Sequence, residues 1–294
     1  MHTVVSDPQQ LPVVVAIDQA REHLAIVDLG VEEAVRRRAP LTIMHVWPSR
    51  HSTTTGARSP LPTEADSRHL LDLAARRARH RAPRLLVGTE LLHGRASTVL
   101  TQRSASARLL VVGHRDEALT QPSWGSTATY LAHQSACPLL VRRGSAPPRG
   151  PVVLAASAGP QPTSTVACAY EEAARLEAQL VALHVAASAA GPEASMADRQ
   201  LAEALAGWAW AYPDVVVERL IVPDVDLGYT LQRAARRSRL LVAGMGRTGR
   251  FAELVYGSLG IAAMRGAVCP VLLVPPAWRS GSAQEKAMRA ATTT

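Results

Sequence analysis

The sequence predicts two tandem α/β domains, each with a five-stranded, mostly parallel sheet between helices. Short apolar runs alternate with segments of helical periodicity along most of the chain. The length of 294 residues suits two domains of about 140–150 residues better than one. Apolar residues make up 47% of the chain and are mostly Ala, Val and Leu, with one Phe. Small aliphatic cores of this kind favour β-α-β layers over aromatic-rich sandwiches.

Internal repetition is the strongest of these signals, because five landmarks recur in the same order. The spacing between the copies falls from 139 to 131 residues after the second predicted strand, where the loop 48–62 is longer than its partner 186–195. Loops tolerate such length changes because closure entropy grows slowly with length. The paired segments are 11–18 and 150–157, 41–46 and 180–185, 108–113 and 239–244, 125–126 and 257–258, and 137–141 and 269–274.

Each repeat is predicted to be a (βα)4β unit, with strands buried on both faces and amphipathic helices between them. In the first repeat the predicted strands are 13–17, 41–46, 84–92, 109–112 and 138–141, and the helices are 22–38, 64–79, 96–107 and 126–135. In the second the strands are 152–156, 180–185, 215–222, 240–243 and 271–274, and the helices are 164–178, 196–210, 227–236 and 258–265.

The segment 142–151 (RRGSAPPRGP) is a predicted linker, because it is rich in Gly and Pro. We therefore expect domains over residues 1–143 and 151–277. The remaining residues, 278–294, are small, polar and aperiodic, and we expect them to form a disordered tail.

Charge and hydropathy narrow the classes of function. The net charge is +8, but nearly all cations are Arg and they spread along predicted helices, as at 36–38 and 236–237. We interpret these as solvated helix faces and do not expect a nucleic-acid partner. No apolar run approaches 18 residues and no signal peptide is recognisable, so we expect a cytoplasmic protein without membrane contact.

Catalytic and metal motifs are missing from the sequence. Cys137, Cys168 and Cys269 show no disulfide or metal pattern and are expected to lie in the interior. His45 and His184 lie near the ends of buried strands, and we interpret them as satisfied interior histidines ahead of ligand contacts. The remaining histidines show no metal spacing, and there is no nucleophile elbow or Walker A lysine. We therefore expect no metal site and no enzyme.

A glycine-rich stretch follows the fourth predicted strand of the second repeat, where an open parallel sheet has its ligand crevice. Glycines let the backbone approach a phosphate, and a helix amino end supplies unpaired N–H groups to an anion. The glycines would also serve a tight turn, but their position favours an anion site. The candidate residues are Gly244, Gly246, Arg247, Gly249, Gly257 and Ser258.

This stretch resembles the glycine loop of universal stress proteins, G-x2-G-x9-G-(S/T). The resemblance to that family covers about residues 11–143 and 151–276. The resemblance implies a Rossmann-like, adenine-nucleotide alpha-hydrolase-like fold, with ATP as ligand, alone or with Mg. An Asp after the first strand would hold the adenosine and the loop the phosphates. It also implies a regulatory stress-response protein whose two repeats pair as an internal pseudo-dimer through their fifth strands, and it leaves a further homodimer open.

Both repeats depart from the family pattern, in opposite ways. The second repeat has Arg247 at the middle-glycine position, with Gly246 and Gly249 beside it, and Ser157 in place of the Asp. The second repeat therefore keeps loop residues that would hold phosphate and lacks the carboxylate that would hold the adenosine.

The first repeat keeps Asp18, Gly113, Gly125 and Ser126, but its loop lacks internal glycines and has Asp116 at the middle position. A carboxylate there would repel phosphate oxygens. Asp18 is open to a second interpretation, as a cap of the following helix or loop.

We therefore expect at most one adenine-nucleotide site, in the C-terminal repeat, with the N-terminal repeat as a structural partner. The alternative is a scaffold or interaction protein in which both sites have decayed. A slow ATPase is a third and weaker hypothesis, because no general base is identifiable beside the loop.

Overall fold

The computed structural model describes residues 11–19, 23–47, 63–113, 127–143, 147, 149–156, 163–186, 191–223, 233–245 and 269–279. These residues belong to two compact units, Met1–Arg142 and Arg143–Thr294. The domain bounds expected from the sequence, 1–143 and 151–277, stay a prediction. Of the predicted C-terminal tail, residues 280–294 lie outside the described residues.

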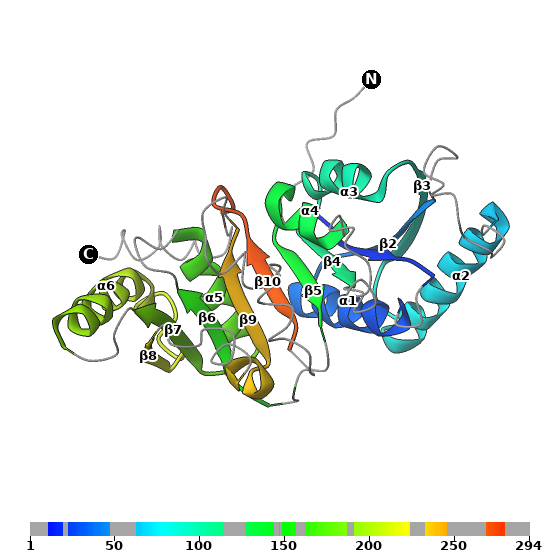
Figure 1. Ribbon diagram of the computed structural model, residues 1–294. Helices are drawn as coiled ribbons and strands as arrows, with labels where there is room; N and C mark the ends of the chain where they lie inside the picture. Colours follow the sequence, from blue (N-terminus) through cyan, green and yellow to red (C-terminus); the bar gives the residue numbers. More distant parts are fainter. Residues whose placement is uncertain are drawn as a thin grey trace, which may run out of the picture. The chain divides into compact units, whose positions relative to one another are not determined.

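Unit 1 is a parallel sheet with the strand order β3-β2-β1-β4-β5. Helices α1 and α2 lie on one face of this sheet, and α3 and α4 on the other (Figure 1). The strands are β1 (Val13–Ile17), β2 (Leu41–Trp47), β3 (Val87–His93), β4 (Leu109–Gly113) and β5 (Leu139–Arg142), and the helices are α1 (His23–Arg37), α2 (Glu64–Arg81), α3 (Ala96–Ser104) and α4 (Thr127–Gln134).

Unit 2 repeats this sheet, with β8-β7-β6-β9-β10 taking the places of β3-β2-β1-β4-β5. The mixed α/β fold with a mostly parallel sheet is thereby confirmed. Residues 233–237 are also helical. The elements are β6 (Val152–Ala156), α5 (Thr163–Arg175), β7 (Leu180–Ala186), α6 (Gly191–Ala209), β8 (Val217–Pro223), β9 (Leu240–Gly244) and β10 (Val271–Val274).

The two central strand pairs have equivalent registers. Val13 of β1 pairs with Leu109 of β4, and Val152 of β6 pairs with Leu240 of β9. These strands are covered on both faces, and β6 is buried along its whole length. The sequence repeat is therefore a repeat of register as well as of topology.

The cores are aliphatic, as the composition predicts. Among the largest side chains that are fully buried, Tyr170 is the single aromatic and the others are Leu and Ile. Burial of one Leu or Ile side chain stabilises the fold by about 1.5–3 kcal/mol. Small side chains also let helix and sheet approach closely: a Cβ on Gly30 of α1 would lie 2.1 Å from Cγ2 of Val15 in β1.

Helix α2 begins with a capping box. The Thr63 hydroxyl accepts a hydrogen bond from the Asp66 backbone N–H, and the Asp66 carboxylate accepts one from the Thr63 N–H. This satisfies two backbone donors that a helix start otherwise leaves unpaired. Farther along α2, Arg77 donates two hydrogen bonds of 2.6 and 2.7 Å to Asp28 of α1. These contacts link the two helices that cover one face of the sheet.

Several predicted bounds are wrong near turns. The strand predicted from residue 84 begins at Val87, because a turn precedes it in which the Leu85 N–H bonds to the Ala82 carbonyl at 3.0 Å. In unit 2 the strand predicted from 215 begins at Val217, after the equivalent bond from Val215 to Tyr212. The helix predicted over 96–107 ends at Ser104.

Two helices of unit 2 also differ from prediction. The helix α5 ends at Arg175 instead of residue 178, because Glu177 takes the left-handed conformation with φ of 49°. The helix α6 begins at Gly191, so the second half of the predicted loop 186–195 is helical. Pro192 fits there because first-turn N–H groups have no partner within the helix. The helix predicted over 258–265 lies outside the described residues.

The close approach of α1 to β1 yields a test with a matched control. Gly30→Ala should lower the free energy of unfolding by about 1–3 kcal/mol, because the added methyl group overlaps Val15. Gly207→Ala in α6 meets no atom within 4 Å and should raise it by about 0.5–1 kcal/mol through helix propensity. Denaturant unfolding of both variants checks this, and shifts of the same sign would contradict the packing.

Candidate functional site

The order of strands in unit 1 contains a topological switch point. The chain runs from β1 outward to β2 and β3, then crosses back to β4 on the other side of β1. Open α/β sheets bind ligands at the carboxyl ends of the strands that flank such a point, and we call this position the crevice. Ala16 pairs with Val112, so Asp18 and Gly113 lie at the same edge of the sheet. The sequence predicts Asp18 and Gly113 at the carboxyl ends of the first and fourth strands, and the structure brings them to one edge of the sheet.

Unit 2 has the equivalent crevice between β6 and β9. Ala155 pairs with Ala243, so the end of β6 lies beside Gly244, the last residue of β9. The next residue, Met245, donates its N–H to the Val274 carbonyl at 2.7 Å, which ties the start of the glycine stretch to β10. The stretch therefore begins at the predicted place.

The predicted site residues fall into two groups. Asp18, Gly113 and Gly244 are described, and all three lie at carboxyl ends of central strands. The others lie outside the described residues, and their roles stay predictions: Gly125, Ser126, Ser157, Gly246, Arg247, Gly249, Gly257 and Ser258.

Gly113 has a packing role of its own. A Cβ at this position would lie 2.4 Å from Cδ1 of Ile26 in α1. Helix α1 therefore closes over the end of β4 with an apolar side chain. In unit 1 the first glycine of the motif is explained by this close approach, without a ligand.

Two polar residues that sequence reasoning missed lie in the first turn of α5, which follows β6. Ser164 is 8% exposed and Thr165 1% exposed, and neither hydroxyl has a hydrogen-bond partner. The signal available in the sequence was the presence of hydroxyl residues at the start of the helix that follows the first strand of the repeat. The burial and the missing partners were not visible in the sequence.

The two strand-end histidines are interior residues, as expected. His45 is buried, and its Nδ1 lies 2.9 Å from the Ile17 carbonyl oxygen, so it ties β2 to β1 near the crevice. His184 of β7 is also buried, and burial lowers its pKa. A lowered pKa keeps this imidazole neutral at pH 7, so it contributes no positive charge for an anion.

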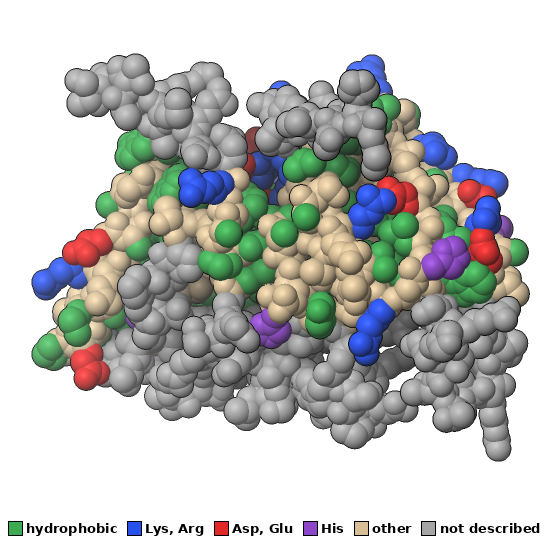
Figure 2. Space-filling model, turned by 90° about the horizontal axis from the view of Figure 1, so that it is seen from above, with side chains coloured by type: hydrophobic (Ala, Val, Ile, Leu, Met, Phe, Trp, Pro, Cys, Tyr) green, Lys and Arg blue, Asp and Glu red, His purple; other side chains and the backbone are tan. Residues whose placement is uncertain are grey.

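Several arginines of the described regions pair with carboxylates along helix faces. In α1 and α5 the same motif recurs: Arg36 pairs with Glu32 and Glu33, and Arg175 pairs with Glu171 and Glu172. On the face drawn in Figure 2, Lys and Arg side chains stand in separate small groups, several of them beside Asp or Glu. This pattern agrees with the interpretation of the arginines as helix-face residues.

In the described parts of the chain, no group of three or more His, Cys, Asp or Glu side chains is placed to hold a metal ion. None of the described helices is both long and apolar enough to cross a membrane.

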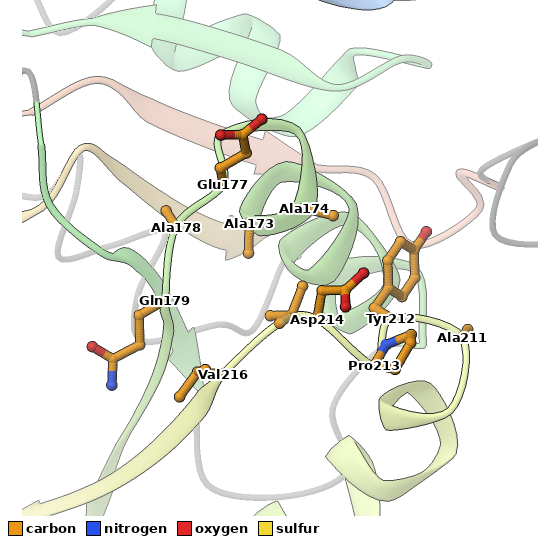
Figure 3. A pocket seen from close by; sticks show the side chains of 11 residues that line it. Ala173, Ala174, Glu177, Ala178, Gln179, Ala211, Tyr212, Pro213, Asp214 and Val216 are labelled. Carbon is orange, nitrogen blue, oxygen red and sulfur yellow. The ribbon is translucent and has the colours of Figure 1, made fainter.

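A pocket of about 400 Å³ lies at the opposite end of the unit 2 sheet, between the end of α5 and the turn before β8 (Figure 3). Its lining includes the carboxylates of Glu177 and Asp214, which would repel phosphate groups. In unit 1 the equivalent turns carry Arg38 and Arg84. The pocket is therefore separate from the crevice and has the wrong charge for a nucleotide phosphate.

Comparison with known proteins gives consistent matches over nearly the whole chain. The model of the universal stress protein family matches residues 11–143 and 149–275. A universal stress protein of Mycolicibacterium smegmatis is 30% identical, over 93% of this chain and 100% of the relative. One from Mycobacterium tuberculosis is 28% identical, over 91% and 97%. The crystal structure of a universal stress protein from Archaeoglobus fulgidus matches in fold, with a TM-score of 0.66 at 12% identity over 91% and 97%.

The cysteines provide a test of the packing of the interior at the amino ends of β5 and β10. All three are buried, and burial raises the pKa of Cys137 and of Cys269 to about 12 from the ordinary 9.0. Iodoacetamide at pH 8 should leave both unmodified in the folded protein and label them after denaturation, as mass spectrometry would show.

Ser106→Cys supplies the control, because it adds a thiol at an exposed turn. Labelling of Cys137 or Cys269 as fast as the control thiol would show that the interior is open.

The same thiols predict how stability depends on pH. Above pH 9 the unfolded chain loses thiol protons that the folded chain keeps, so the free energy of unfolding should fall as the pH rises from 9 toward 12.

Proposed function

Because this chain belongs to the universal stress protein family, we propose that it binds an adenine nucleotide in its C-terminal repeat. In this proposal it acts as a regulatory stress-response protein, not as an enzyme. ATP is the proposed ligand, alone or with Mg. The N-terminal repeat serves as a structural partner without a nucleotide of its own.

One observation carries the proposal: Gly244 ends a central strand at the crevice of unit 2 and opens the glycine stretch that leads to Gly257 and Ser258. Backbone N–H groups at a glycine-rich turn and a helix start are suited to phosphate oxygens. The sequence adds Arg247 and Arg250, whose charges favour an anion. Ser157 stands where the family pattern has an Asp, so the adenosine contact of that carboxylate is missing from this repeat and the proposal rests on the phosphate-directed residues.

Unit 1 supports the asymmetry. The loop sequence that follows β4 carries Asp116, where the family pattern has its middle glycine, and Glu117 beside it. Ile26 covers the end of β4 at Gly113. Carboxylates near a triphosphate cost free energy through repulsion, most strongly where water is excluded. We therefore assign the single proposed site to unit 2.

The alternative is a scaffold of the same fold that binds no nucleotide. The loss of the Asp from one repeat and of glycines from the other favours this second candidate. It differs from the proposal in one measurable respect, the affinity for ATP. The internal pseudo-dimer and a further homodimer stay predictions from the family resemblance.

Isothermal titration calorimetry with ATP and AMP tests the proposal. We expect the wild type to bind with a stoichiometry near one. Gly257→Arg with Ser258→Ala should weaken ATP binding by at least about tenfold, because it fills the phosphate position and removes a donor, a loss of about 1.4 kcal/mol or more.

The matched control is Gly125→Arg with Ser126→Ala, the same change in unit 1, which should leave ATP affinity unaltered. Absence of binding by the wild type would favour the scaffold. Two equivalent sites, or a loss confined to the unit 1 variant, would refute the assignment to unit 2.

A further inference from the structure

The first turn of α5 contains two buried hydroxyls whose bonding potential is unmet. Thr165 is 1% exposed and Ser164 is 8% exposed, and neither side-chain oxygen has a hydrogen-bond partner. A buried hydroxyl without a partner destabilises the fold, so proteins rarely keep one without a reason. A bound molecule that supplies the missing acceptor is one such reason.

Four other hydroxyls in or directly after the described helices donate to the backbone of their own helix. Each donates to the backbone carbonyl of the residue four positions earlier, a bond that needs a preceding residue at or within the helix. Ser164 and Thr165 are the second and third residues of α5, so the carbonyls four positions earlier precede the helix. The four satisfied residues are Ser67, Thr101, Ser195 and Ser238.

Comparison of the two repeats indicates what the side chain of Thr165 faces. Its counterpart in unit 1 is Ile26, whose Cδ1 lies 2.4 Å from a Cβ placed on Gly113 at the end of β4. The counterpart of Gly113 is Gly244, and α5 packs against both β6 and β9 as α1 does against β1 and β4. At the same position over the crevice, unit 1 therefore has an apolar cover and unit 2 has a hydroxyl.

The surroundings of these hydroxyls suit an anion. The first turn of α5 has backbone N–H groups that the helix itself leaves unpaired and the positive end of the helix dipole, and it contains no acidic residue. Helix α5 follows β6 and packs against both β6 and β9, so its first turn lies at the end of the sheet where Gly244 ends β9. Phosphate oxygens accept hydrogen bonds from hydroxyl and N–H donors of this kind.

We propose that Ser164 and Thr165, with the amino end of α5, form a second anion-binding position of the unit 2 site and bind a phosphate of the nucleotide. This inference rests on the proposed function and goes beyond the glycine stretch. It explains why unit 2 differs from unit 1 at Thr165: the exchange of an apolar side chain for a hydroxyl adds a donor where phosphate lies.

Thr165→Val tests the inference, because valine has nearly the same shape and lacks the hydroxyl. We expect the affinity for ATP to fall about ten- to hundredfold, the usual effect of losing one hydrogen bond to a charged acceptor. The affinity for adenosine, which has no phosphate, should stay the same. The melting temperature should stay equal or rise, because an unsatisfied hydroxyl is removed. Thr165→Ser should retain ATP affinity.

Thr101→Val is the matched control, since that hydroxyl is bonded to the Ser97 carbonyl at 2.8 Å in unit 1. It should lower the melting temperature and leave ATP affinity unchanged. Equal ATP affinity of Thr165→Val and wild type would overturn the inference. An equal loss of adenosine affinity would also overturn it, because the hydroxyl would then contact the nucleoside.

Inorganic pyrophosphate separates this inference from the proposed function. If the wild type does not bind ATP, the proposed function fails. Thermal stabilisation of the wild type by pyrophosphate, lost in Thr165→Val, would still support an anion position at α5. No stabilisation by pyrophosphate together with no ATP binding would overturn both.

Discussion

The parallel pairing of the first strand of each repeat with the fourth is the constraint on which the rest of the structure depends. In unit 1 this is β1 with β4, and in unit 2 it is β6 with β9. The pairing places the most buried strands at the centre of each sheet, so it organises the core. It also places the reversal of strand order between these two strands, and open α/β sheets bind ligands at the carboxyl ends of the strands at such a point. Core and candidate site therefore have one structural origin.

A shared frame lets local chemistry diverge. Where helix covers sheet near the crevice, unit 1 has Ile26 and unit 2 has Thr165. At the far end, the turns that carry Arg38 in unit 1 carry Glu177 in unit 2, with left-handed φ of 50° and 49°. Because strand order and register are equivalent in the two units, these are differences of side-chain chemistry on the same frame. One repeat can lose a binding role while it still supplies a complete core.

Much of this fold could be predicted from the sequence, because fully buried parallel strands read as continuous apolar runs and the repeat supplies each element twice. The predicted ends of helices were wrong where backbone conformation overrides composition. Glu177, a non-glycine residue with positive φ, ends one helix early, and at Gly191 a glycine and a proline begin another. The crevice residue Gly244 was found because glycines leave a visible pattern. Thr165 was not, because burial and a missing hydrogen-bond partner depend on packing that a sequence does not display.

Hydrogen–deuterium exchange with and without ATP tests the central claim, that two equivalent crevices differ and only that of unit 2 binds nucleotide. Peptides that cover residues 163–168 and 244–258 should exchange more slowly when ATP is present, because bound phosphate pairs with their backbone N–H groups. Peptides over 23–28 and 109–127, the equivalent segments of unit 1, should exchange at the same rate with and without ATP. Protection of the unit 1 peptides, or no protection in unit 2, would contradict the account.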